Sequence, residues 1–125
     1  MRKPLILIFS ITLLLLTTTN VHAQKEPKRE ELLEEALIVR YLPYILEVTD
    51  KLFMCERITN IKRLGGNRDH EVVIEVVTFE KAHMPPHDLF RIKLIDTPDK
   101  ITVTDVNRTE NISPEQLKKH CSYKE

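Results

Sequence analysis

Apolar positions recur at helical spacing in the first part of the chain that follows residue 28. Leu33, Leu37, Tyr41 or Tyr44, and Val48 follow one another at intervals of three to four residues. Acidic side chains crowd the first turns, where the helix dipole favours negative charge: Glu30, Glu31, Glu34 and Glu35. Pro43 lacks an N–H and clashes with the carbonyl four residues back. The pattern therefore predicts two helical pieces, residues 29–41 and 43–54, or one helix kinked at Pro43.

Beyond Cys55 the apolar period changes to two and β-branched residues dominate, which is typical of strands. Four strands are predicted, over residues 57–64, 71–82, 89–96 and 101–106. The segments between them are short and contain turn residues: the only two glycines lie in 65–69, two prolines in 83–87, and Pro-Asp in 97–100. Connections of this length favour an antiparallel meander.

A second helix is predicted near the end of the chain. Ser113 is a typical N-cap, Pro114 suits the first helical position, and Gln116 stands three residues after the cap. This helix should end near Cys121. The resulting fold class is α+β: a kinked N-terminal helix or helix pair packed on a four-stranded antiparallel meander sheet, with a short C-terminal helix. We expect a single domain over residues 24–125, with its core at about 29–108.

The first 23 residues have the features of a signal peptide. Arg2 and Lys3 supply positive charge, an apolar run covers residues 5–16, and Ala23 ends a small-residue cleavage motif. The alternative is a membrane-spanning helix, but the apolar run lasts about 12 residues where a span needs roughly 20. We therefore expect cleavage after Ala23, a secreted protein that begins at Gln24, and no stable transmembrane anchor afterwards.

Composition limits the function further. The 125 residues include 19 Lys and Arg against 19 Asp and Glu, a balance that argues against nucleic acid as a partner. Cys55 and Cys121 are the only cysteines. In an oxidising compartment they are expected to form a disulfide that ties the C-terminal helix to the end of the main helix.

The order of several short motifs resembles a known family. A signal peptide, the sequence Tyr-Leu-Pro-Tyr-Ile at 41–45, a Val-rich strand, and His-x-Pro-Pro at 83–86 before a strand at 89–95 together resemble short secreted proteins of spore-forming Gram-positive bacteria, catalogued as a domain of unknown function. The resemblance covers about residues 31–106 and departs at Phe53-Met54-Cys55 and in the longer tail. It implies secretion and a single domain, and it leaves the function open.

Little in the sequence indicates catalysis. The only serines beyond the signal peptide, Ser113 and Ser122, lie in the tail, and no nucleophile elbow, phosphate loop or zinc motif is present. No cofactor is therefore predicted. The sharpest local cluster is the turn with His83, Met84 and His87, whose imidazole and thioether groups suit copper. The simpler interpretation is a rigid turn with solvated histidines.

The hairpin around this turn assigns two faces to the sheet. Pairing Ala82 with Asp88 places the even-numbered apolar residues on the buried face: Val72, Ile74, Val76, Phe90, Ile92 and Leu94. The odd-numbered set mixes apolar and charged side chains on the outer face: Val73, Glu75, Val77, Phe79, Arg91, Lys93 and Ile95. An exposed apolar patch among charges is typical of an interaction surface.

We therefore expect a non-enzymatic binding or interaction module outside the cell membrane. Its partner would be an envelope protein, a cell-wall component or a second copy of the chain. Two alternatives belong to other classes. One is copper binding through His83, Met84 and His87, and the other is a small cone-shaped α+β enzyme with Glu75 inside a curved sheet.

Overall fold

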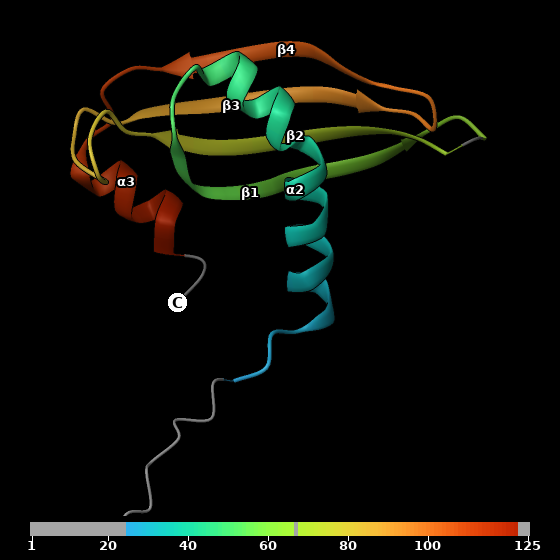
Figure 1. Ribbon diagram of the computed structural model, residues 1–125, viewed down its shortest axis with the longest axis horizontal. Coiled ribbons are helices and arrows are strands. Elements are labelled where there is room, and N and C mark those ends of the chain that lie inside the picture. Colours follow the sequence, from blue (N-terminus) through green and yellow to red (C-terminus); the bar gives the residue numbers. More distant parts are fainter. Residues whose placement is uncertain (1–24, 67, 123–125) are drawn as a thin grey trace, which may run out of the picture.

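The structure, a computed structural model, describes residues 25–66 and 68–122 (Figure 1). The order of elements is α2 (Arg29–Thr49), β1 (Phe53–Leu64), β2 (Asp69–Thr78), β3 (Asp88–Asp96), β4 (Ile101–Thr109) and α3 (Pro114–Cys121). The predicted α+β class is confirmed. The signal peptide expected over residues 1–23, with cleavage after Ala23, lies outside the described residues, as does Asn67 in the first turn. Neither described helix combines the length and apolarity needed to cross a membrane.

Helix α2 continues through Pro43. Neither the predicted pair of helical pieces nor the predicted kink at Pro43 is confirmed. Pro43 and Val39 are both exposed, so the carbonyl of Val39 that loses its helical partner lies on the solvent side of the helix, where its loss costs least. The helix ends at Thr49 rather than Met54, because Asp50 adopts a left-handed conformation (φ 51°) and its N–H bonds to the carbonyl of Leu46.

The four strands form an antiparallel meander in the order β1-β2-β3-β4. Asp88 pairs with Thr78 instead of the predicted Ala82. The strand stops at Thr78 because the N–H of Phe79 turns to the carbonyl of Leu52, and Ala82 and His83 then adopt positive φ angles of 26° and 64°. The register differs from the prediction by an even number of residues, so each side chain keeps its predicted face.

The hydrophobic core lies between α2 and one face of the sheet. All six even-numbered residues predicted for this face are buried there, and α2 adds Ile38, Tyr41 and Ile45. The buried stripe of the helix matches the predicted one only at Tyr41. Leu37 and Val48 pack only at the edge of the core, and Leu33 lies 53% exposed.

The C-terminal segment spans the other face of the sheet. It leaves β4 at one sheet edge, and Cys121 forms the predicted disulfide with Cys55 in β1 at the opposite edge. Along the way the N–H of Ile112 bonds to the carbonyl of His87 at 2.8 Å. The disulfide joins α3 to a strand rather than to the end of α2, because the helix ends before residue 55. As predicted, α3 is capped by Ser113 and Gln116 in a reciprocal capping box.

Candidate functional site

The outer sheet face predicted as a binding surface is not an exposed patch. Val73 and Val77 are buried, and Glu75 is nearly so. Of the other four predicted residues, Phe79, Lys93 and Ile95 are half-buried and only Arg91 is exposed. The prediction that an apolar patch is exposed here is wrong. The disulfide brings α3 to this side of the sheet, where His120 lies beside Glu75.

Glu75 is the centre of a charged network on this side. Its Oε2 accepts hydrogen bonds from Arg57 Nη2 at 2.8 Å and Nε at 3.3 Å. His120 Nδ1 of α3 lies 3.4 Å from the same oxygen, and Arg91 Nη1 lies 3.8 Å from Oε1. The geometry makes Glu75 an anchor for α3.

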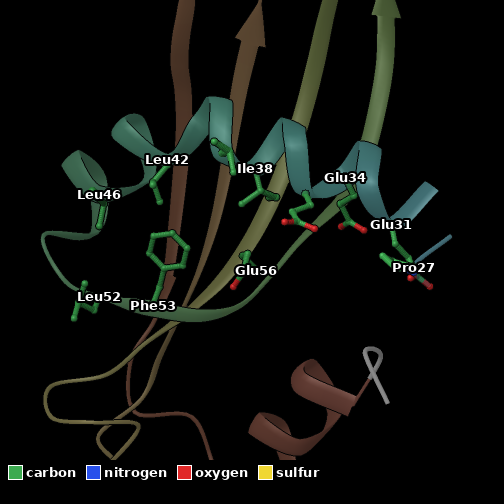
Figure 2. Close-up of a pocket in the computed structure, with 11 residues that line it drawn as sticks. Pro27, Glu31, Glu34, Ile38, Leu42, Leu46, Leu52, Phe53 and Glu56 are labelled. Atoms are coloured by element: carbon green, nitrogen blue, oxygen red, sulfur yellow. The ribbon is translucent and has the colours of Figure 1, made fainter. Parts of the chain in front are cut away.

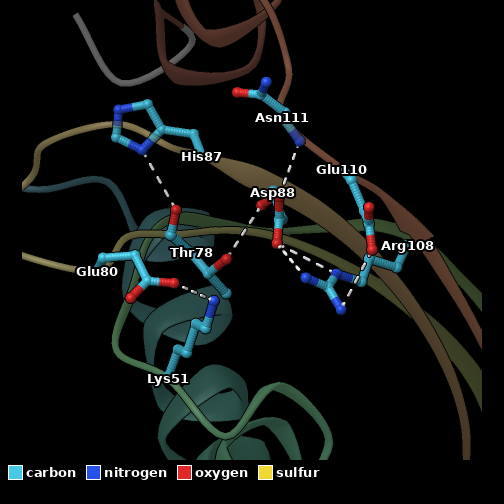
Figure 3. Close-up of polar contacts among 8 residues, drawn as sticks. All are labelled: Lys51, Thr78, Glu80, His87, Asp88, Arg108, Glu110 and Asn111. Carbon is cyan, nitrogen blue, oxygen red and sulfur yellow. Dashed lines mark hydrogen bonds and ion pairs between the residues drawn. The ribbon is translucent and has the colours of Figure 1, made fainter.

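The turn between β2 and β3 separates the three side chains predicted to bind a metal. The ring of His83 packs on Phe79 with centroids 4.8 Å apart, and its Nδ1 lies 3.3 Å from the sulfur of Met54. Met84 points to solvent. His87 is buried, and its Nδ1 lies 3.2 Å from the carbonyl oxygen of Thr78 (Figure 3).

Within residues 25–66 and 68–122, no three His, Cys, Asp or Glu side chains are grouped so as to hold a metal ion. The thioether that lies beside the His83 ring belongs to Met54, which was not among the predicted metal ligands. Copper binding at this turn stays a prediction.

Asp88 fixes the start of the C-terminal segment (Figure 3). Its carboxylate accepts a hydrogen bond from Arg108 Nη2 at 2.7 Å and another from the N–H of Asn111 at 2.8 Å. Burial alone would raise the pKa of Asp88, but these two donors outweigh it and lower the pKa below its usual value. The ionised carboxylate thus joins the beginning of β3 to the end of β4.

A concave surface lies between α2 and the start of β1, and we call it the α2–β1 groove. It has a volume of about 870 Å³. Phe53 projects from β1 towards Leu42 of the helix, and Glu31 and Glu34 stand at the far end (Figure 2). The lining residues are Pro27, Glu31, Glu34, Glu35, Ile38, Val39, Leu42, Leu46, Leu52, Phe53 and Glu56.

An exposed apolar stripe of α2 borders the groove. Leu32, Val39 and Leu46 follow one another at intervals of seven residues, and Leu42 stands three residues after Val39. These side chains are 48%, 64%, 38% and 39% exposed, in the order Leu32, Val39, Leu46 and Leu42. A period of seven places them on one side of the helix, as in the seam between two packed helices. These four side chains stay exposed after the described residues have packed together.

The acidic end of the groove carries charge without internal compensation. Glu31, Glu34 and Glu35 form no ion pair with any described Lys, Arg or His. Glu31 accepts the N–H of Lys28, and Glu34 accepts the N–H of Ile58 on the outer edge of β1 at 2.7 Å. Both partners are backbone N–H groups, so neither contact brings a positively charged side chain to the groove.

Sequence reasoning missed this groove. The spacing of Leu32, Val39 and Leu46 was visible in the sequence, but it competed with the stripe that begins at Leu33. Which stripe is buried depends on how the helix is rotated over the sheet, and a helical period alone does not determine that rotation.

Comparison with known protein families, with curated proteins and with solved structures finds no match to this chain. The resemblance to short secreted proteins of Gram-positive bacteria accordingly stays a prediction.

Proposed function

We propose that this protein is an exported, non-enzymatic binding module and that its binding site is the α2–β1 groove. The observation that carries the proposal is the groove itself, because about 870 Å³ of concave surface lies over an apolar floor. Volumes of this size are typical of ligand sites. A small domain gains stability by burying leucine side chains, so leucines left exposed along a groove favour a role in binding.

The chemistry of the lining favours binding over catalysis. Its side chains are aliphatic or aromatic except for four glutamates, and none carries a hydroxyl, thiol, amine or imidazole group. Glu34 already serves as a hydrogen-bond acceptor for the edge of β1. The groove therefore offers shape, apolar contact and negative charge.

The disulfide supports a location outside the reducing interior of the cell. Cys55 and Cys121 are joined across the sheet, and such bonds persist in exported proteins. Export and the cleavage after Ala23 are part of the proposal.

A photo-activated cross-linker at position 39 tests the proposed site in the cells that produce the protein. Val39 lies in the groove, whereas Leu33 is similarly exposed and does not line it. We expect a discrete adduct from position 39 and none from the matched position 33. Adducts of equal yield from both positions, or from neither, would contradict the groove as the binding site.

A further inference from the structure

We propose that the occupant of the α2–β1 groove is a basic amphipathic helix of a partner protein, an inference that rests on the proposed function. Its apolar row would lie along Leu32, Val39, Leu42 and Leu46, and its basic side chains would meet Glu31, Glu34 and Glu35. The stretch of α2 from Glu31 to Leu46 is about 22 Å long, enough for three to four turns of a second helix at about 5.4 Å a turn.

The chemistry of the lining favours a helix over an extended peptide. No lining side chain is a hydrogen-bond donor, and the N–H of Ile58 on the edge of β1 is occupied by Glu34. An extended chain would therefore leave its carbonyl groups unpaired against the apolar floor, which is costly. A helix bonds its own carbonyls and presents side chains at i, i+3, i+4 and i+7 to the groove.

The charge of the groove favours a positively charged partner. The uncompensated glutamates stand at one end of the groove, so a ligand with lysine or arginine at the matching end gains attraction that an acidic or neutral helix lacks. None of the lining residues carries positive charge. An acidic surface next to an apolar one thus selects a cationic amphipathic segment.

The same charges argue against a second copy of this chain. The last turn of α2 contains no basic residue, and Glu47 and Asp50 stand at that end. An antiparallel copy would place these acids against Glu31 and Glu35, and a parallel copy would place Glu31 and Glu35 against themselves. Like charges in contact weaken either arrangement.

The test uses the exported protein and three probes. The first is an 18-residue Leu/Lys helical peptide with lysines gathered at one end. The second is the same peptide with glutamate in place of lysine, and the third is an apolar fluorescent dye. We expect the basic peptide to bind at least tenfold more tightly than the acidic one at low salt, and to weaken as salt screens the charges.

Three variants locate the binding. Leu42→Asp should weaken the basic peptide at least tenfold, Glu35→Lys several-fold, and the matched control Leu33→Asp should leave it unchanged. All three side chains are exposed, so the fold should survive, and thermal melts check this. Amide chemical shifts of the wild-type protein give a second measurement that needs no variant: the basic peptide should shift residues 31–46 and 52–56.

The outcomes separate the two proposals. One result would be that the dye or the acidic peptide binds in the groove, that Leu42→Asp abolishes this binding, and that the basic peptide binds no more tightly. That result overturns the proposed ligand class but not the proposed binding site. Absence of any binding that depends on Leu42, with no shifts along the groove, overturns both.

Discussion

On the α2 side of the sheet, a large apolar cluster closes the structure, whereas the α3 side combines a few buried apolar residues with one covalent bond and one group of charges. The first side buries a cluster of aliphatic and aromatic residues that includes Ile45, Ile74 and Ile92. The second side has a short helix with no buried residue, held by the Cys55–Cys121 bridge and by the contact of His120 with Glu75.

The difference shows how a small domain divides its apolar residues. A domain of this size buries too little surface to pack two full cores. The long helix covers the larger apolar face, and the short tail buries little apolar area of its own and is held by a covalent bond. Helix α2 then keeps apolar residues that the sheet does not cover, and these border the α2–β1 groove.

A substitution in the α2-side core should destabilise the protein most. Ile92→Ser leaves a cavity and buries a hydroxyl, and we expect a loss of about 5 kcal/mol in the free energy of unfolding. Urea unfolding followed by circular dichroism measures this. The matched change Ile61→Ser, at an exposed position of β1, should cost about 0.5 kcal/mol or less. Equal losses from the two variants would contradict the position of the core.

Removal of the disulfide tests the other side. The bond closes a separation of 66 residues, and the chain-entropy model gives about 4 kcal/mol for Cys55→Ala with Cys121→Ala. Amide hydrogen exchange should accelerate over 112–121 well before it does at Ile74. Reductant should destabilise the wild-type protein and leave the double variant unchanged. Two reactive thiols in the untreated native protein would refute the bridge.

The charged network should have a smaller effect. Glu75→Gln keeps the shape of the side chain but removes its charge from beside Arg57 and His120, and we expect a loss of about 2 kcal/mol. Arg91→Gln is the matched control, because its contact with Glu75 is long and exposed and should contribute about 0.5 kcal/mol or less. Thermal melts compare the two, and a larger effect from Arg91 would mean that Glu75 does not anchor α3.

The smallest expected effect is on the stability of the protein at acidic pH. Asp96 of β3 accepts hydrogen bonds from Arg40 Nη2 at 2.9 Å and from the hydroxyl of Tyr41 at 2.7 Å. Burial alone would raise the pKa of Asp96, but Arg40 and Tyr41 outweigh burial and lower it. The ionised form therefore stabilises the fold above about pH 4, and this contribution is lost as the pH falls through the lowered pKa. Urea midpoints between pH 6 and 2 should fall less steeply in Asp96→Asn, and parallel curves would contradict this.

Local features of the sequence were enough to predict the strands, the capped C-terminal helix and the sheet faces. The face of Ile92 was predicted correctly although the hairpin register was wrong, because a period of two survives any even shift. Ser113, Pro114 and Gln116 determine a helix start within four residues. The count of cysteines sufficed for the bridge.

Features that depend on distant segments were not predictable in this way. The alternation that places Val73 and Val77 on the outer face does not say whether a distant part of the chain covers that face. The α2–β1 groove requires a particular rotation of α2 over the strands. Continuation of α2 through Pro43 depends on which side of the helix faces water.

The bridge between Cys55 and Cys121 has a consequence for proteolysis. The exposed turns at residues 65–66 and 80–86 and the one at 98–100 all lie between the two cysteines. A protease that cuts the chain in any of them leaves both fragments covalently attached, and the cut ends stay beside strands that remain paired. The nicked molecule would keep its size on a non-reducing gel and separate into two bands only after reduction.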